Sequence, residues 1–136
     1  STRAIFTFKG FGETHHVYKH HDGYMTGAAE ALGAAVELAW TLPRYEPDEF
    51  GAAFVSANKP KAGGGIRLAR RRTEHVDVEY GYTVEPDRSV PSLLKLTVHD
   101  TRYWDGFKQT KIWSGPLLDF IANAEQIEEE YFELDE

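Results

Sequence analysis

The chain has 136 residues, of which 41% are hydrophobic and 13% aromatic, so it is long and apolar enough for one domain with a hydrophobic core. It contains no cysteine, which excludes disulfide scaffolds, thiolate metal sites and cysteine nucleophiles. Its 22 acidic residues outnumber its 15 lysines and arginines, and the net charge of −7 disfavours general binding to nucleic acid. No stretch resembles a membrane span or a secretion signal, so a cytoplasmic protein is expected.

The first half of the chain predicts a hairpin followed by two helices. Apolar periodicity places strands at 4–9 and 14–19 and helices at 26–40 and 47–57. Thr26 is a suitable N-cap for the first helix, and Pro47 suits the first position of the second. Asn58-Lys59-Pro60 is expected to end the second helix, because proline interrupts the helical hydrogen bonds.

The second half predicts mainly strands. Candidate strands lie at 66–69, 76–84, 93–99 and 107–113, separated by segments with turn residues. Within 76–84 the apolar residues alternate, so they are expected to share one face of the sheet. Gly115-Pro116 is expected to open a last helix that frays into an acidic tail, at about 125–136. The alternative is that the apolar residues of this segment dock on the domain, namely Ile127, Tyr131, Phe132 and Leu134.

The predicted order of elements is therefore ββααββββα. Short strands that are not interleaved with helices indicate a mainly antiparallel sheet with the helices packed on one face. No repeat or linker divides the chain, so residues 1–136 are expected to form a single α+β domain. Because the edge strands of such a sheet need cover, a homodimer is compatible with this fold.

The segment from His15 to Gly27 is the strongest candidate for a functional site. It holds four of the six histidines and turns through Asp22-Gly23 into the first helix. Backbone amides at a helix N-terminus lack intrahelical partners, so the amides of residues 26–28 are expected to face an anion. Gly27 has no Cβ and would let a ligand approach. The predicted ligand-binding residues are Lys19, His20, His21, Tyr24, Thr26 and Gly27, with Arg67 and Arg70 as further cationic groups.

Other interpretations of these residues remain open. The same segment is also compatible with a purely structural corner between a strand and a helix. Two histidines on one strand face could bind zinc if a third ligand approached, but the spacing matches no metal motif, and no metal ligand or cofactor is assigned. No motif of a nucleophilic or phosphate-transferring enzyme occurs, and no catalytic residue is assigned. The acidic tail is typical of a solvated segment, or of one that binds a basic protein surface.

Two stretches together resemble a known family. They are Tyr18-Lys19-His20-His21-Asp22-Gly23-Tyr24, with Gly27 after it, and the run from Leu42 to Phe50, which continues to Asn58-Lys59. Both are similar to small uncharacterised proteins of phages, prophages and their bacterial hosts. Proline commonly follows the last tyrosine in that family, whereas this chain has Met25. The resemblance implies a phage-type accessory protein of the bacterial cytoplasm, and it transfers no activity and no catalytic residue.

Residues and resemblance together predict a non-catalytic binding protein. Its expected partner is an anionic, nucleotide-like small molecule, captured to counter host defence. One alternative is an inhibitor that applies an acidic surface to a basic host protein. A metal-assisted hydrolase based on the histidines is a further alternative.

Overall fold

The protein is a six-stranded sheet with three helices on one face, as seen in a computed structural model that describes residues 1–90, 92–101 and 110–134. The strands are β1 (Ala4–Gly10), β2 (Glu13–Lys19), β3 (Ile66–Ala69), β4 (Tyr80–Pro86), β5 (Leu94–Asp100) and β6 (Thr110–Pro116). The helices are α1 (Met25–Leu38), α2 (Pro47–Ala62) and α3 (Leu117–Leu134), with a short 3-10 turn at Gly63–Gly65. The predicted α+β class, element order and helical face are confirmed.

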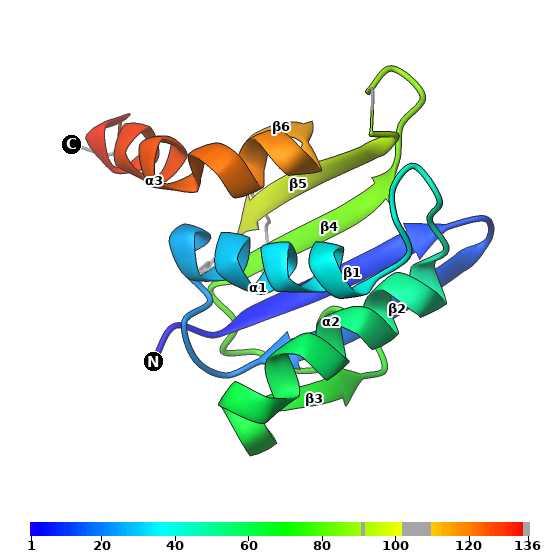
Figure 1. The fold of residues 1–136 in the computed structure, drawn as a ribbon. Coiled ribbons are helices and arrows are strands. Elements are labelled where there is room, and N and C mark those ends of the chain that lie inside the picture. The colour runs from blue at the N-terminus through cyan, green and yellow to red at the C-terminus, as the bar shows by residue number, and fades with distance from the viewer. Residues whose placement is uncertain (91, 102–109, 135–136) are drawn as a thin grey trace.

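The sheet order is β3-β2-β1-β4-β5-β6, and every neighbouring pair is antiparallel except β1 and β4. The chain therefore has to pass from the edge strand β3 to the central strand β4. Residues 70–79 make this crossing on the face of the sheet opposite the helices. Figure 1 shows α1 lying across the middle of the other face, between α2 and α3.

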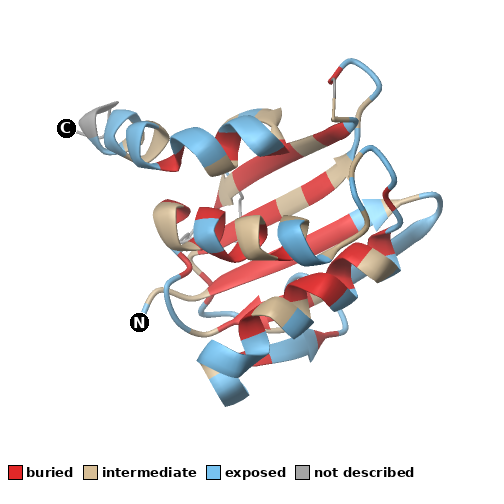
Figure 2. Ribbon diagram, in the orientation of Figure 1, coloured by how far each residue is buried: buried red, intermediate tan, exposed pale blue. Residues whose placement is uncertain are grey.

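The core lies between the sheet and the helices. Phe6 of β1 is fully buried, and its ring centroid lies 4.5 Å from that of Phe54 on α2 and 5.0 Å from that of Tyr82 on β4. Small residues on α1, among them Ala28 and Ala35, are fully buried and let this helix approach the strands. Figure 2 shows the buried residues concentrated on the central strands and on the helix faces that meet them.

Both helices of the first half have other bounds than predicted, and the first of them ends at Leu38 rather than at residue 40. Helix α1 begins at Met25, and its N-cap is Tyr24, so Thr26 lies inside the first turn and does not cap the helix. Helix α2 continues through Pro60 to Ala62. Its end is held by the Lys59 side chain, whose Nζ donates to the carbonyls of Gly63 and Ile66 at 2.8 and 2.9 Å.

The second half also departs from prediction at its boundaries. The strand expected over 76–84 begins only at Tyr80, because the residues before it make the crossing, and Val78 packs on the opposite face from Tyr80. The strand expected over 107–113 is observed from Thr110 to Pro116, and residues 107–109 lie outside the described residues. Gly115 and Pro116 are therefore the last residues of β6, and the predicted last helix follows them directly from Leu117.

The acidic tail is helical where fraying was expected. Helix α3 runs to Leu134 with a local irregularity at Asn123. Its second half is anchored to the domain, because Tyr131 donates a hydrogen bond to Asp100 of β5 at 2.5 Å and Ala124 is buried.

Candidate functional site

The corner between β2 and α1 is hydrogen-bonded to the segment before β1 and to β4. The Gly23 amide donates to the carbonyl of Thr2 at 2.9 Å, and the Tyr82 hydroxyl donates to the carbonyl of Gly23 at 2.6 Å. A Cβ on Gly23 would lie 2.7 Å from the Ala4 Cβ, so only glycine fits here. Asp22 has a positive φ of 57°, which aspartate tolerates better than most residues. The corner is thus a rigid platform for the side chains around it.

The first turn of α1 is satisfied by the protein itself. The Thr26 amide donates to Oε2 of Glu128, on α3, at 2.9 Å, and the Ala28 amide donates to the Tyr24 carbonyl at 2.8 Å. A Cβ on Gly27 would lie 2.1 Å from the carbonyl oxygen of Asp22. The expectation of free amides is therefore wrong for residues 26 and 28, and Gly27 makes room for the chain's own backbone.

This contact makes Glu128 a helix-capping residue supplied by another element. We expect Glu128→Ala to lower the free energy of unfolding by about 1 kcal/mol, because the variant loses both a hydrogen bond and a favourable charge at a helix N-terminus. Urea denaturation of wild type and variant measures this. Glu129→Ala, which removes the neighbouring exposed carboxylate, is the control and should change stability much less. Equal effects of the two substitutions would show that the cap contributes nothing specific.

A pocket of about 340 Å³ lies beside this corner, between α1 and α2. We call it the α1–α2 pocket. Four of the eight predicted ligand residues line it, namely Lys19, His21, Tyr24 and Gly27. The other lining residues are Asp22, Glu30, Ala31, Ala34, Ala57, Asn58, Lys61 and Ala62. The pocket thus combines an alanine-rich wall with a small set of charged and aromatic groups, as ligand pockets commonly do.

Lys19 is the most unusual group in this pocket. As the last residue of β2 it faces the helices, and only 7% of its surface is exposed. Its Nζ donates to the carbonyl of His21. Burial lowers the pKa of Lys19 below its ordinary value, while the carboxylates of Asp22 and Glu30 act in the opposite direction. A buried ammonium group of this kind favours any anion that can reach it.

Two further polar side chains of the pocket, Tyr24 and Asn58, are held by hydrogen bonds within the protein. Tyr24 donates to Oδ1 of Asp22 at 3.4 Å, and the nearby Asp22 charge is the main reason why the pKa of Tyr24 is raised. Asn58 is 8% exposed, and its Nδ2 donates to the carbonyls of Ala31 and Phe54 at 3.2 and 2.8 Å. Asn58 therefore joins α1 to α2 at the pocket. Asn58, Glu30 and Lys61 were missed by the sequence interpretation, and only the polar Asn58 on an otherwise apolar helix face gave a signal.

The other predicted site residues lie elsewhere. His20 and Arg67 are on the far face of the sheet, around Tyr18, where His20 Nδ1 lies 2.7 Å from the tyrosine hydroxyl and the Arg67 guanidinium lies 5.1 Å from the ring centroid. Arg70 pairs with Glu74 at 2.9 Å. Thr26 lines a groove between α1 and α3. The structure therefore does not bring the eight residues together around one ligand.

The far face of the sheet carries histidines with lowered pKa values. His16 Nδ1 lies 2.9 Å from the Thr7 hydroxyl, and burial is the main cause of the lowered pKa of His16 and of His99. The cationic charge of Arg72 contributes to both shifts. Both histidines are thus neutral over a wider pH range in the folded protein than in the unfolded chain.

We expect these histidines to make the protein acid-sensitive. A base whose folded-state pKa lies below its unfolded value binds fewer protons when folded, so stability falls as the pH drops below about 6.5. The free energy of unfolding should therefore be lower at about pH 5.5 than at about pH 7.5. His16→Gln should reduce that difference, and urea denaturation at the two pH values measures it. An unchanged pH dependence in the variant would contradict this assignment.

Within residues 1–90, 92–101 and 110–134, no group of three or more histidine, aspartate or glutamate side chains is arranged to hold a metal ion. Nor does any helix in this part of the chain have the length and apolar character needed to cross a membrane. No protein-family model, curated protein or solved structure matches the chain.

Proposed function

We propose that this protein binds a small anionic molecule in the α1–α2 pocket, without catalysing a reaction on it. The buried Lys19 ammonium at the pocket wall is the observation that carries the proposal. It has three N–H donors, and the His21 carbonyl accepts from it. An anionic group of the ligand would replace water at this ammonium and offset its desolvation.

The charges around the pocket narrow the class of ligand. Lys19 and Lys61 are cationic, whereas Asp22 and Glu30 are anionic, so the pocket as a whole is close to neutral. A polyanion would be repelled by the two carboxylates. A molecule with one anionic group and several hydrogen-bond donors fits better, with its anion at Lys19 and its donors toward the acids.

Pocket size narrows the class further. A volume of about 340 Å³ is at the low end of the range for ligand pockets, about 300–1,000 Å³. This favours a molecule no larger than a mononucleotide. The resemblance to phage-type proteins makes nucleotides the first compounds to test, and a role in countering host defence would follow if the ligand is a signalling nucleotide of the host.

Thermal unfolding with a panel of linear and cyclic nucleotides tests the proposal. A ligand present at about 100 times its dissociation constant should stabilise the protein by about 2.7 kcal/mol, which raises the melting temperature by several degrees. Mononucleotides should give larger shifts than dinucleotides. If no compound in the panel, inorganic phosphate included, shifts the melting temperature, the proposed ligand class is wrong.

A further inference from the structure

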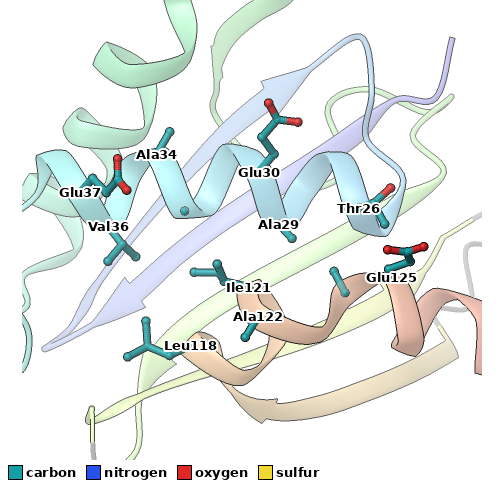
Figure 3. A pocket seen from close by; sticks show the side chains of 12 residues that line it. Thr26, Ala29, Glu30, Ala34, Val36, Glu37, Leu118, Ile121, Ala122 and Glu125 are labelled. Atoms are coloured by element: carbon teal, nitrogen blue, oxygen red, sulfur yellow. The ribbon is translucent and has the colours of Figure 1, made fainter.

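A second concave surface lies between α1 and α3, away from Lys19. It is a groove of about 680 Å³ whose floor includes Val36, Leu118 and Ile121 and whose rim carries Glu30, Glu37 and Glu125. Figure 3 shows Leu118 and Ile121 of α3 opposite Val36 of α1, with Glu37 on α1 and Glu125 on α3, while the Glu30 side chain extends from the side of α1 turned away from α3. We call this surface the acidic groove.

The apolar floor of the acidic groove is open to solvent. Leu118 is 41% exposed, and Gly33 and Ala122 add small residues that keep the floor accessible. A Cβ placed on Gly33 would lie 3.4 Å from Ile121, so the two helices already touch beneath the groove. An apolar floor with a polar rim is the usual composition of a protein-binding surface.

The charge of the groove is of one sign only. Helix α1 carries two glutamates, α3 carries six acidic residues, and neither helix contains a lysine, arginine or histidine. The rim therefore complements a cationic partner and disfavours an acidic one. This charge pattern is the feature that selects the occupant.

The form of the groove indicates a helical occupant. Its walls are two helices, whose backbone N–H and C=O groups are hydrogen-bonded within each helix. An extended peptide would therefore find no strand edge to pair with here. The part of α1 that lines the groove runs from Thr26 to Glu37, roughly 17 Å at the rise of an α-helix. About three turns of an amphipathic helix match this length.

We propose that the acidic groove binds a basic amphipathic helix of a partner protein. The apolar side of that helix would lie on Leu118, Ile121 and Val36, and its lysines or arginines would face Glu37 and Glu125. Glu30 and Ala34 line both this groove and the α1–α2 pocket, whereas Leu118, Glu37 and Glu125 line only the groove, so variants at these three positions test it separately from the small-molecule pocket.

The probe is a fluorescent synthetic peptide of about 12 residues, built from leucine and lysine with one apolar face. Fluorescence anisotropy with the full chain measures binding. A scrambled peptide of the same composition, which has no apolar face, is the first control. The proposal predicts clear preference for the amphipathic peptide and weaker binding in high salt.

Two sets of variants locate the site. Leu118→Asp should weaken peptide binding at least about tenfold, since it places a charge on the apolar floor. Glu37→Gln with Glu125→Gln should weaken it about fivefold at low salt while leaving the fold intact. Leu68→Asp is the matched control, because Leu68 is 79% exposed on β3 and lines a separate apolar hollow. Melting curves confirm that each variant is folded.

Three results would overturn the proposal. Equal binding of the amphipathic and scrambled peptides would mean attraction by net charge alone. Loss of binding in Leu68→Asp but not in the groove variants would place the site on the other hollow. Sedimentation that shows a dimer of the protein alone, dissociated by Leu118→Asp, would mean that a second copy of this chain covers the groove.

Discussion

Gly27→Ala is expected to destabilise the protein by about 2–3 kcal/mol, although alanine is the better helix former. The added Cβ would lie 2.1 Å from the carbonyl oxygen of Asp22, which is a backbone atom. That carbonyl cannot move away easily, because the next residue, Gly23, is hydrogen-bonded to Thr2 and Tyr82. The steric cost should therefore exceed the gain in helix propensity of about 1 kcal/mol.

Gly33→Ala provides the matched control for this prediction. Gly33 is in the same helix, and its nearest neighbour, the Ile121 side chain, would lie 3.4 Å from the new Cβ. This substitution should leave stability unchanged or raise it by up to about 1 kcal/mol. Urea denaturation of the two variants measures the contrast. If Gly27→Ala were as stable as Gly33→Ala, the Asp22 carbonyl could not lie as close to residue 27 as the structure places it.

Lys19→Met is expected to abolish binding of the small anion, with a loss of at least about a hundredfold in affinity. Methionine keeps an unbranched side chain of similar length but removes the ammonium. The free energy of unfolding should not fall in this variant. Burial lowers the pKa of Lys19, so the charged amine is less favourable in the folded state than in the unfolded chain, and its removal costs no stability. Calorimetric titration measures the loss of binding, and urea denaturation measures the stability.

The control for this variant is Lys95→Met. Lys95 lies on β5, on the face of the sheet opposite the helices, since its neighbours Leu94 and Leu96 belong to the core. Removing this charge changes the net charge by the same amount as Lys19→Met. Similar losses of affinity in both variants would indicate a general electrostatic effect rather than a site at Lys19.

Much of the fold was predictable because it depends on local patterns. The strands predicted at 4–9 and 14–19 and the first helix were confirmed, although β1 is buried on both faces and not on one as its alternating sequence pattern suggests. The start of β4 was not predictable, because residues 76–79 have a strand-like pattern but are used to cross the sheet. That crossing follows from the position of β3 at the edge, which is a property of the whole fold.

The site was predictable only in part, for a related reason. Lys19, His21 and Tyr24 line one pocket because they follow each other around a single corner. The partner of the Thr26 amide is Glu128, 102 positions further along the chain, and no local pattern indicates such a contact. The separation of His20 from Lys19 follows from the alternation of side chains along a strand, which places neighbours on opposite faces.

Proton uptake on binding would show directly that the anion lies against the Lys19 ammonium. An anion at Lys19 favours the protonated amine and raises its pKa, so binding at alkaline pH, where this amine is partly neutral, should take up protons. Calorimetric titration with an adenine nucleotide in two buffers of different ionisation enthalpy measures this uptake. Proton uptake is expected in the wild type and in Lys95→Met. Binding without any proton uptake would contradict it, because the anion would then lie away from Lys19.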